Sequence, residues 1–483
     1  MHAIEKGPKM IKSLTWFYGR FFVEIYSVLF IILGIFGVLH HDLWRDELQA
    51  WLIARYSHSI PELLYNLRYE SHPPLWYFLL FWFKNITSNP KSMQFLHLGL
   101  ASINAWLVLK FAPFSRLQKV FLIFGWFLFY EFALISRSYV LGVFFIFLFC
   151  ILARQQKRDY LLLALVLILL NFTSILGLIL AVAFAAFLVL EAIQMPVLLE
   201  HKRPQALVAL FLLISAVFTG LIIMNPLPDS GWIKGLISWP GPRPFFKSLI
   251  LAYFPYWGSI RMISVSLLQF SYLFFFLSFF FFYRKGSVLF LYAIGVLGLV
   301  LFFSMINNLF SRHMGHLFIL LVACWWICPQ IPSWANRLIT VVLFIQLAVG
   351  LGAYKSNLNL TFSDGKDAAI YIKMHKLDQL PIIVAGSGGV PISGYLNKPV
   401  FYLVRERWGT FYIYDNKAAE FSSQQMLDQA QRISRQFKKD AVLALSHPLE
   451  NSLLSPSVQK LDSFTKGQLQ DEHYYLYLFK GIH

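Results

Sequence analysis

The chain has 483 residues, of which 58% are hydrophobic, 18% aromatic and only 13% charged. Soluble globular proteins carry roughly 25% charged residues, so about half of the usual solvating surface is missing. The mean hydropathy of +0.60 points the same way. This composition excludes a soluble enzyme, a disordered chain, a collagen and a disulfide-stabilised scaffold, and it indicates a membrane protein.

The net charge of +17 is unevenly distributed. Residues 1–354 hold 26 Lys and Arg against 12 Asp and Glu, whereas residues 355–483 hold 15 against 12. The basic excess therefore belongs to the apolar part of the chain. In a membrane protein such an excess is interpreted by its position relative to the bilayer, not as a nucleic-acid footprint.

Long apolar runs predict about eleven transmembrane helices. The first run follows a basic N-terminus, is too long for a signal peptide and has no small-residue cleavage site after it, so we expect a retained span. The stretch at 74–83 is too short to cross a bilayer and is rich in Trp and Tyr, so it is predicted to be an interfacial helix. The predicted spans lie near 21–40, 93–111, 119–135, 138–153, 160–171, 173–192, 205–224, 263–283, 286–305, 315–330 and 337–354.

The positive-inside rule predicts a cytoplasmic N-terminus and an external C-terminus. With this orientation every even-numbered connection is short and basic, and counting 74–83 as a span would place these clusters outside. The clusters are Lys110, Arg116 and Lys119; Arg154, Lys157 and Arg158; Lys202 and Arg203; Arg284 and Lys285; and Arg337.

Residues 355–483 have the pattern of a small α/β domain, which this topology places outside the membrane. Helices are predicted at 364–376 and 422–439, and strands at 381–385, 400–403, 441–445 and 474–479. The sequence Gly386-Ser387-Gly388-Gly389 follows the first strand. It lacks the Lys-Ser/Thr of a phosphate-binding loop and the spacing of a dinucleotide fingerprint, so a plain turn is expected.

The three cysteines, Cys150, Cys324 and Cys328, all lie inside apolar runs. Cys324 and Cys328 are four residues apart, which is compatible with a zinc pair, but no His or carboxylate lies beside them. We expect small hydrophobic residues within a helix.

The predicted external connections contain more basic residues than the positive-inside rule requires. Long external loops escape that rule, which is one explanation; a pocket for an anionic headgroup such as a lipid phosphate is the other. Arg137 lies between two spans, and Arg312-His313 lies just before another, which favours the pocket for these positions. The basic residues are Arg45, Arg55, Arg68, Lys84, Lys91, Arg137, Lys234, Arg243, Lys247, Arg261 and Arg312.

Two external loops are candidates for chemistry. The first, at 41–92, contains Asp46 and Glu47 directly after the first span. A carboxylate at the membrane surface can act as a general base on a hydroxyl acceptor, and Asp46 can equally cap the helix that follows; both readings can hold at once. The second loop, at 225–262, is rich in Pro, Gly and Trp and has the length of a functional loop or lid. Its aromatic residues suit sugar faces as well as the membrane interface.

Three features together resemble the GT-C superfamily of glycosyltransferases. They are the Asp46-Glu47 pair after the first span, the His-Pro-Pro-Leu motif at 72–75, and Arg137 with Tyr139 at an external helix start. Within that superfamily the chain is similar to the bacterial relatives of protein O-mannosyltransferases and of the aminoarabinose transferase that modifies lipid A. The resemblance covers roughly residues 20–200. The chain lacks an obvious β-trefoil insertion, which leaves a protein acceptor in doubt.

The resemblance implies an integral-membrane enzyme of the bacterial inner membrane and cell envelope, with a GT-C-like catalytic part at 1–354. Such enzymes transfer a sugar from a polyprenyl-phosphate carrier to a glycolipid, polysaccharide or protein acceptor outside. For this chain we expect the transfer to invert the anomeric centre. Asp46 matches the catalytic base, Glu47 is a possible second acid, and His72 matches the histidine that shapes the loop.

Arg137 and Tyr139 match residues near the donor; Arg45 also belongs to the expected substrate site. Arg312 and His313 are assigned to the carrier phosphate from topology alone.

The expected chemistry needs fixed cations, because the leaving lipid phosphate departs as an anion. No clear Asp, Glu and His cluster with ligand spacing is present, so no obligatory metal or other cofactor is expected, although a divalent metal could serve the same purpose. The alternatives are a transporter or flippase of lipid-linked sugars, and a polymerase or ligase of surface polysaccharide. No internal repeat is found, and the charges lie at span ends, which favours the enzyme over the transporter.

Overall fold

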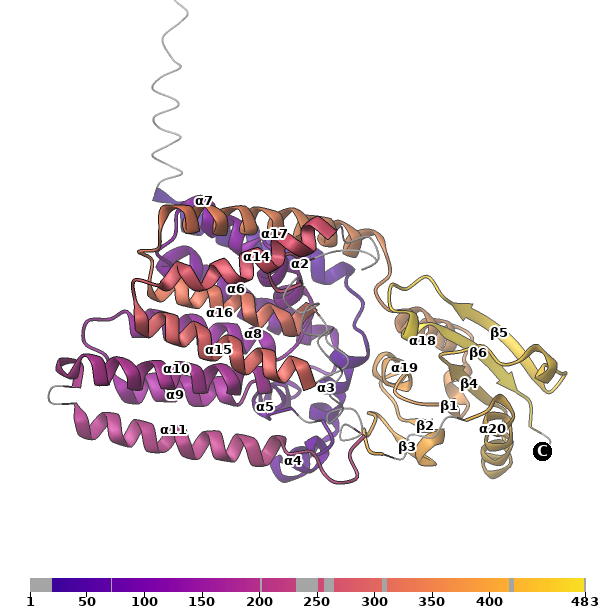
Figure 1. Ribbon diagram of the computed structural model, residues 1–483. Helices are drawn as coiled ribbons and strands as arrows, with labels where there is room; N and C mark the ends of the chain where they lie inside the picture. Colours follow the sequence, from indigo (N-terminus) through magenta and orange to yellow (C-terminus); the bar gives the residue numbers. More distant parts are fainter. Residues whose placement is uncertain are drawn as a thin grey trace, which may run out of the picture.

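The computed structural model describes residues 20–70, 72–199, 202–231, 251–255, 265–305, 311–416 and 421–481. A bundle of long helices forms the larger part, and a domain with a β-sheet, made by the C-terminal residues, lies against one end of it (Figure 1). The molecule is therefore mostly helical with a small C-terminal sheet domain, as the sequence predicts in outline.

The first part of the chain forms helices that follow the apolar runs. Asp159 and Ser174 accept hydrogen bonds from backbone N–H groups in the first turns of α9 and α10, which satisfies donors that a helix start leaves unpaired. The elements are α2 (Phe22–His40), α3 (Arg45–Tyr56), α4 (Ile60–Leu67), α5 (Leu75–Phe83), α6 (Lys91–Phe111), α7 (Arg116–Ile123), η1 (Trp126–Leu134), α8 (Tyr139–Ala153), α9 (Tyr160–Asn171) and α10 (Ile175–Gln194).

The second part continues the bundle and then leaves it. The helix α17 extends five residues beyond Tyr354, the end of the predicted membrane part, so the chain enters the C-terminal domain after Asn359. The elements are η2 (Pro196–Leu199), α11 (Arg203–Met224), α14 (Val265–Phe279), η4 (Phe280–Phe282), α15 (Gly286–Met305), α16 (Ser311–Ile327) and α17 (Ser333–Asn359).

Seven helical stretches in the described ranges are long and apolar enough to cross a membrane. Helices also lie at the other predicted runs, but they are shorter. The description as a polytopic membrane protein therefore agrees with the structure, whereas a count of eleven spans and their direction stay predictions. The seven stretches are Phe22–His40, Lys91–Phe111, Arg116–Leu134, Ile175–Gln194, Arg203–Met224, Gly286–Met305 and Ser333–Asn359.

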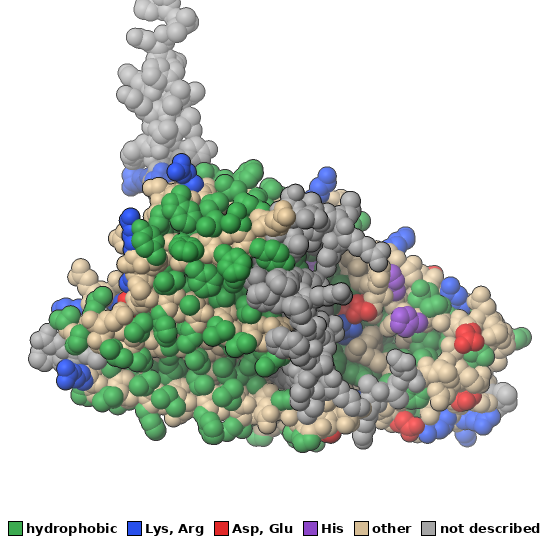
Figure 2. All heavy atoms as spheres, in the orientation of Figure 1, with side chains coloured by type: hydrophobic (Ala, Val, Ile, Leu, Met, Phe, Trp, Pro, Cys, Tyr) green, Lys and Arg blue, Asp and Glu red, His purple; other side chains and the backbone are tan. Residues whose placement is uncertain are grey.

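The outer surface of the bundle is apolar. Figure 2 shows hydrophobic side chains covering its visible face, while acidic and basic side chains gather on the C-terminal domain and at the far end of the bundle. On α11, Leu207, Phe211 and Phe218 are each about two-thirds exposed. So large an apolar surface is rare on soluble monomers and marks contact with lipid or protein.

The predicted span at 119–135 is divided into two helices. The helix α7 ends at Ile123, and after a break at Gly125 the chain continues as the π-helix η1, all of whose residues are buried. A Cβ atom on Gly125 would lie 2.9 Å from the Phe121 carbonyl oxygen, so the break depends on a residue without a side chain. π-Helical turns are frequent at functional sites.

The stretch predicted to be interfacial forms the nine-residue helix α5, which packs against α3. Trp76 and Tyr77 are buried, whereas Trp82 is 64% exposed. Its length is too small for a membrane span, and its contacts place it among the connections at the end of the bundle that bears the C-terminal domain (Figure 1).

The C-terminal domain contains a six-stranded mixed sheet with the order β3-β2-β1-β4-β6-β5. β1 pairs in parallel with β2 and β4, whereas the β2–β3, β4–β6 and β5–β6 pairs are antiparallel. Every residue of β1, β2 and β4 is buried. The strands are β1 (Ile382–Val384), β2 (Val400–Tyr402), β3 (Arg407–Gly409), β4 (Ala441–Leu445), β5 (Val458–Phe464) and β6 (Tyr474–Phe479).

Three helices complete this domain: α18 (Gly365–Met374), α19 (Gly389–Leu396) and α20 (Ser423–Phe437). Short 3-10 turns at Leu377–Gln379, Leu403–Arg405, Asn451–Leu453 and Gln470–Glu472 connect the elements. The glycine-rich sequence after β1 is a turn that leads into α19, and the hydroxyl of Tyr474 donates to the Gly388 carbonyl at 2.8 Å. The two predicted helices and four predicted strands are confirmed, whereas β3, β5 and α19 are not predicted from the sequence.

Replacing Gly350 with Ala should loosen the contact between α17 and η1. An added Cβ would lie 2.9 Å from the backbone nitrogen of Trp126 and 3.1 Å from the Gly125 carbonyl carbon, and backbone atoms cannot move aside cheaply. We expect a loss of about 1–3 kcal/mol in the free energy of unfolding, measured in detergent. Gly352→Ala is the matched control, because nothing lies within 4 Å of its added Cβ; equal losses in the two variants would contradict the packing argument.

Candidate active site

The candidate site is built around Asp46, in the first turn of α3. Its Oδ2 atom accepts a hydrogen bond from Nη2 of Arg312 at 2.9 Å and lies 3.3 Å from Nη1 of Arg137. The Nε atom of Arg45 lies 3.6 Å from Oδ1. One carboxylate is thus surrounded by three guanidinium groups, which we call the Asp46 cluster.

The three arginines come from parts of the chain that are far apart. Arg45 begins α3, Arg137 lies between η1 and α8, and Arg312 lies in the first turn of α16. Arg137 also donates from Nη1 to the backbone carbonyl of Asp46 at 2.9 Å. The guanidinium of Arg312 lies 4.9 Å from the ring centre of Trp44, the residue that precedes α3.

The electrostatics of the cluster favour an anion. Burial alone would raise the pKa of Asp46, but Arg137, Arg312 and Arg45 outweigh burial and lower it, so Asp46 is a carboxylate at neutral pH. Asp471 lies 2.9 Å from Arg45 but has a 60% exposed side chain, so solvent weakens its effect. Other acids also lie near the arginines: Glu472 near Arg45, Glu70 near Arg137 and Glu131 near Arg312.

His72, from the His-Pro-Pro-Leu motif, belongs to this cluster. Its Nε2 atom lies 3.5 Å from Nη2 of Arg137, a weak contact in which the histidine accepts. Burial, assisted by Arg137, lowers the pKa of His72 to about 3, so the ring is neutral. Its Nδ1 atom is buried and has no hydrogen-bond partner within the described ranges. Buried polar atoms in folded proteins normally have a hydrogen-bond partner, so this nitrogen stands out within the cluster.

Glu47 has a different environment, although it follows Asp46 directly. It is fully buried, and its Oε2 accepts from His41 Nε2 at 3.0 Å and from the Trp44 backbone N–H at 3.3 Å. Its Oε1 accepts from the Ser136 backbone N–H at 2.6 Å. Both oxygens are therefore occupied by contacts that join α3 to α2 and to the end of η1. This geometry indicates a positioning residue for Asp46 and Arg137.

Tyr139 and His313 lie beside the cluster and contact each other. Their ring centres are 5.9 Å apart in an edge-to-face arrangement, and Tyr139 is also 5.2 Å from the ring of His316. His313 and Arg312 are adjacent in α16, so this aromatic group forms one side of the region that contains Arg312.

The other basic residues of the predicted external connections, as far as the structure describes them, do not contact the Asp46 cluster. Arg55 donates to Asn397 at 3.2 Å, the Arg68 guanidinium stacks on the Tyr65 ring at 3.4 Å, and Lys84 donates to the Ser57 carbonyl. Lys91 begins α6. Lys234, Arg243, Lys247 and Arg261 lie outside the described residues, as does nearly all of the predicted loop at 225–262 beyond Gly231.

The C-terminal domain contacts the helix that carries Asp46. The Arg45 backbone N–H donates to Oε1 of Glu472 at 2.9 Å. The side-chain amide of Gln49 both donates to the Tyr412 carbonyl and accepts from the Tyr412 N–H. Lys366 forms an ion pair with Asp42 at 2.8 Å. The position of α3 thus depends on residues that follow it by more than 300 positions.

Several residues of this region are missed by sequence reasoning. Glu70 is buried, accepts from Gln49 at 2.7 Å and has a pKa that burial raises to about 7. Glu472, in the C-terminal domain, is the other example. Glu70 lies two positions before the His-Pro-Pro-Leu motif, and this proximity is a feature of the sequence that could have identified it. No nearby motif marks Glu472, because it reaches the site through a contact with the distant Arg45.

Among the residues in the described ranges, no group of three or more His, Cys, Asp or Glu side chains could hold a metal ion. The three cysteines are buried and free. Comparison with known proteins adds no assignment, since no protein-family model matches the chain and no curated protein is significantly similar in sequence.

Replacing Glu47 with Ala should destabilise the protein by about 3–5 kcal/mol, because the buried Nε2 of His41 and the Ser136 N–H both lose their acceptor. The free energy of unfolding in detergent measures this. The control Glu62→Ala removes one exposed hydrogen bond, from the His58 N–H at the start of α4, and should cost only about 1 kcal/mol. A Glu47→Ala protein that is as stable as the wild type and inactive would instead identify Glu47 as a reacting acid.

The buried carboxyl group of Glu472 should make stability depend on pH. Burial raises the pKa of Glu472 to about 7, from an ordinary value of 4.5. A carboxyl group whose pKa rises on folding contributes stability below about pH 4.5 and loses that contribution as the pH rises towards 7. Thermal unfolding between pH 4.5 and 7.5 should therefore show a decline of up to about 3 kcal/mol from this group.

Glu472→Gln, which stays neutral, should flatten that part of the decline. Asp471→Asn is the matched control at the neighbouring, exposed position and should leave the slope unchanged. The same slope in wild type and Glu472→Gln would show that Glu472 is not a source of the pH dependence.

Proposed function

We propose that the protein is an integral-membrane glycosyltransferase that moves a sugar from a polyprenyl-phosphate-linked donor to an acceptor hydroxyl. The observation that carries the proposal is the Asp46 cluster, in which one carboxylate lies among three arginines from separate elements. The cluster lies at the end of an apolar helical bundle, beneath the C-terminal domain. Such a site combines a base with cations suited to a lipid phosphate.

In the proposed reaction the acceptor oxygen attacks the anomeric carbon of the donor while the bond from that carbon to the phosphate oxygen breaks. The hydroxyl proton passes to Asp46, and polyprenyl phosphate leaves as an anion beside Arg137 and Arg312. Attack on the face opposite the leaving group inverts the anomeric centre. The guanidinium groups stabilise the leaving group, because they stay charged and bind phosphate oxygens in pairs.

The arginines also explain how Asp46 can become basic enough to take the proton of the acceptor hydroxyl. Without a donor they lower the pKa of Asp46, which makes it a weak base. A phosphate that binds Arg137 and Arg312 shares their charge, so the pKa of Asp46 rises towards the value that favours proton transfer. The arginines thus hold Asp46 as an internal counterion, and donor binding activates it.

The other residues have supporting roles in this proposal. His72 orients Arg137 and offers its Nδ1–H to the substrate, Arg45 links the site to the C-terminal domain, and Tyr139 with His313 borders the donor. The predicted orientation places the site on the outer face of a bacterial inner membrane, with a cell-envelope acceptor. No cofactor is required.

A flippase for the same lipid-linked sugars is the alternative function. Glu131, a buried carboxylate inside the apolar helix η1, is the observation that favours it, since ionisable groups within spans often mark transport paths. Glu131 accepts a hydrogen bond from Ser311. A flippase would move the donor lipid between leaflets without releasing polyprenyl phosphate.

Asp46→Asn should lower the rate of transfer by at least about 100-fold, because general-base assistance contributes about 10²–10⁴-fold. Proteoliposomes containing the protein would be given polyprenyl-phosphate-linked sugars and a cell-envelope extract, and release of polyprenyl phosphate would be measured. This readout does not require the sugar or the acceptor to be known in advance.

Asp42→Asn is the matched control, because Asp42 lies in the same loop but pairs with Lys366 outside the cluster. It should retain near-normal release, and both variants should insert and purify like the wild type. Normal release by Asp46→Asn would refute the mechanism. Movement of the lipid between leaflets with no release by the wild type would support the flippase instead.

A further inference from the structure

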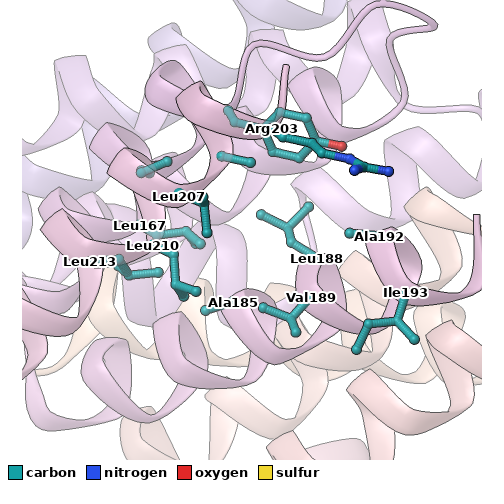
Figure 3. Close-up of a pocket in the computed structure, with 14 residues that line it drawn as sticks. Leu167, Ala185, Leu188, Val189, Ala192, Ile193, Arg203, Leu207, Leu210 and Leu213 are labelled. Atoms are coloured by element: carbon teal, nitrogen blue, oxygen red, sulfur yellow. The ribbon is translucent and has the colours of Figure 1, made fainter. Parts of the chain in front are cut away.

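A second candidate site lies at the end of the bundle away from the C-terminal domain. A cavity of about 320 Å³ is bounded by α9, α10 and α11 (Figure 3). This volume falls in the range of ligand-binding pockets, about 300–1,000 Å³. The cavity exists because α11 packs mainly along α9 and touches α10 much less.

The cavity has a buried floor and an open rim. Leu167 on α9 is fully buried, whereas Ile193 on α10 and Leu207 on α11 are 70% and 67% exposed. Leu188, Leu207 and Leu210 face the space in Figure 3. The lining is therefore almost wholly apolar and open along the outer side of helices that meet the criteria for membrane spans, which suits a hydrocarbon chain.

One end of the cavity is basic. Arg203 is the only charged residue among the lining residues that the structure describes, and it lies at that end, beside the apolar groups (Figure 3). The nearby acid Glu191 is already paired, with Arg158 at 2.7 Å and Lys285 at 3.2 Å. Asp159 caps α9 and accepts from Gln205. Lys202 also lies here and donates to the Arg158 carbonyl. The described residues at this end therefore carry more positive charges than negative ones.

We propose that this cavity binds an anionic phospholipid, with an acyl chain between α10 and α11 and the phosphate at Arg203. Charge complementarity selects an anionic headgroup, and the apolar groove selects a lipid over a soluble phosphate. In the predicted orientation this end faces the cytoplasmic leaflet, where anionic lipids gather. The site lies at the opposite end of the bundle from the Asp46 cluster, so it is separate from the proposed donor site and does not depend on the proposed function.

The test measures lipid retention by native mass spectrometry of the full chain. The protein is purified into detergent with equal amounts of dioleoyl-phosphatidylglycerol and dioleoyl-phosphatidylcholine. The wild type should retain phosphatidylglycerol in preference. Arg203→Gln should reduce that preference by about fivefold, the factor expected for one cation near an anionic headgroup. Arg154→Gln removes an exposed charge from the same end, outside the cavity, and should leave the preference unchanged.

A second variant tests the groove itself. Ala206→Trp places a large ring in the cavity and should reduce retention of both lipids, while the unfolding temperature in lipid-free detergent stays near that of the wild type. Equal retention of the two lipids by the wild type, or equal loss of preference in Arg203→Gln and Arg154→Gln, would overturn the proposal. Normal retention by Ala206→Trp would do so as well.

Discussion

The ionic contact between Asp46 and the arginines is the interaction on which the rest of the site depends. Guanidinium groups at the edge of an apolar bundle are costly unless a counterion and hydrogen bonds accompany them. Asp46 supplies that counterion to Arg137 from the η1–α8 junction and to Arg312 from α16. Three separate parts of the bundle thus meet at one carboxylate. Three guanidinium groups around one carboxylate also present hydrogen-bond donors that suit an anionic group.

The position of Asp46 is fixed by the helix α3, because α3 is bonded both to the bundle and to the C-terminal domain. Glu47 joins it to the bundle through His41 and Ser136, and Gln49 and Arg45 join it to the C-terminal domain. The adjacent carboxylates Asp46 and Glu47 consequently have different environments. One lies at the partly exposed cluster, and the other is enclosed in a hydrogen-bonded network. The C-terminal domain is therefore a structural partner of the candidate site as well as an appended unit.

Much of the fold could be predicted because apolar runs and turn residues act locally. The long helices and the buried strands β1, β2 and β4 follow directly from such patterns. The strands β3 and β5 were missed because they are short or largely exposed at the sheet edges, and carry few apolar residues. The π-helix η1 was missed because its hydrophobic pattern does not differ from that of an α-helical span. The break at Gly125 depends on close packing that only the folded structure shows.

The site could be predicted only in part, for the same reason. Asp46, His72 and Arg137 stand out by motif, and Arg312 by its place before a span, but their contacts join residues up to 266 positions apart. Glu472 contacts Arg45 over 427 positions and carries no local signal. Glu47 shows what the sequence leaves out: its proximity to Asp46 suggests a second acid, and only the structure shows that it is buried and accepts three hydrogen bonds. Long-range electrostatic contacts, not local patterns, decide these assignments.

The most direct test of the central claim is an experimental structure of the protein with polyprenyl phosphate bound. The account predicts that phosphate oxygens lie within hydrogen-bonding distance of the Arg137 and Arg312 guanidinium groups, and that these contacts replace part of their pairing with Asp46. A phosphate bound elsewhere, with the ion pairs of Asp46 unchanged, would contradict it.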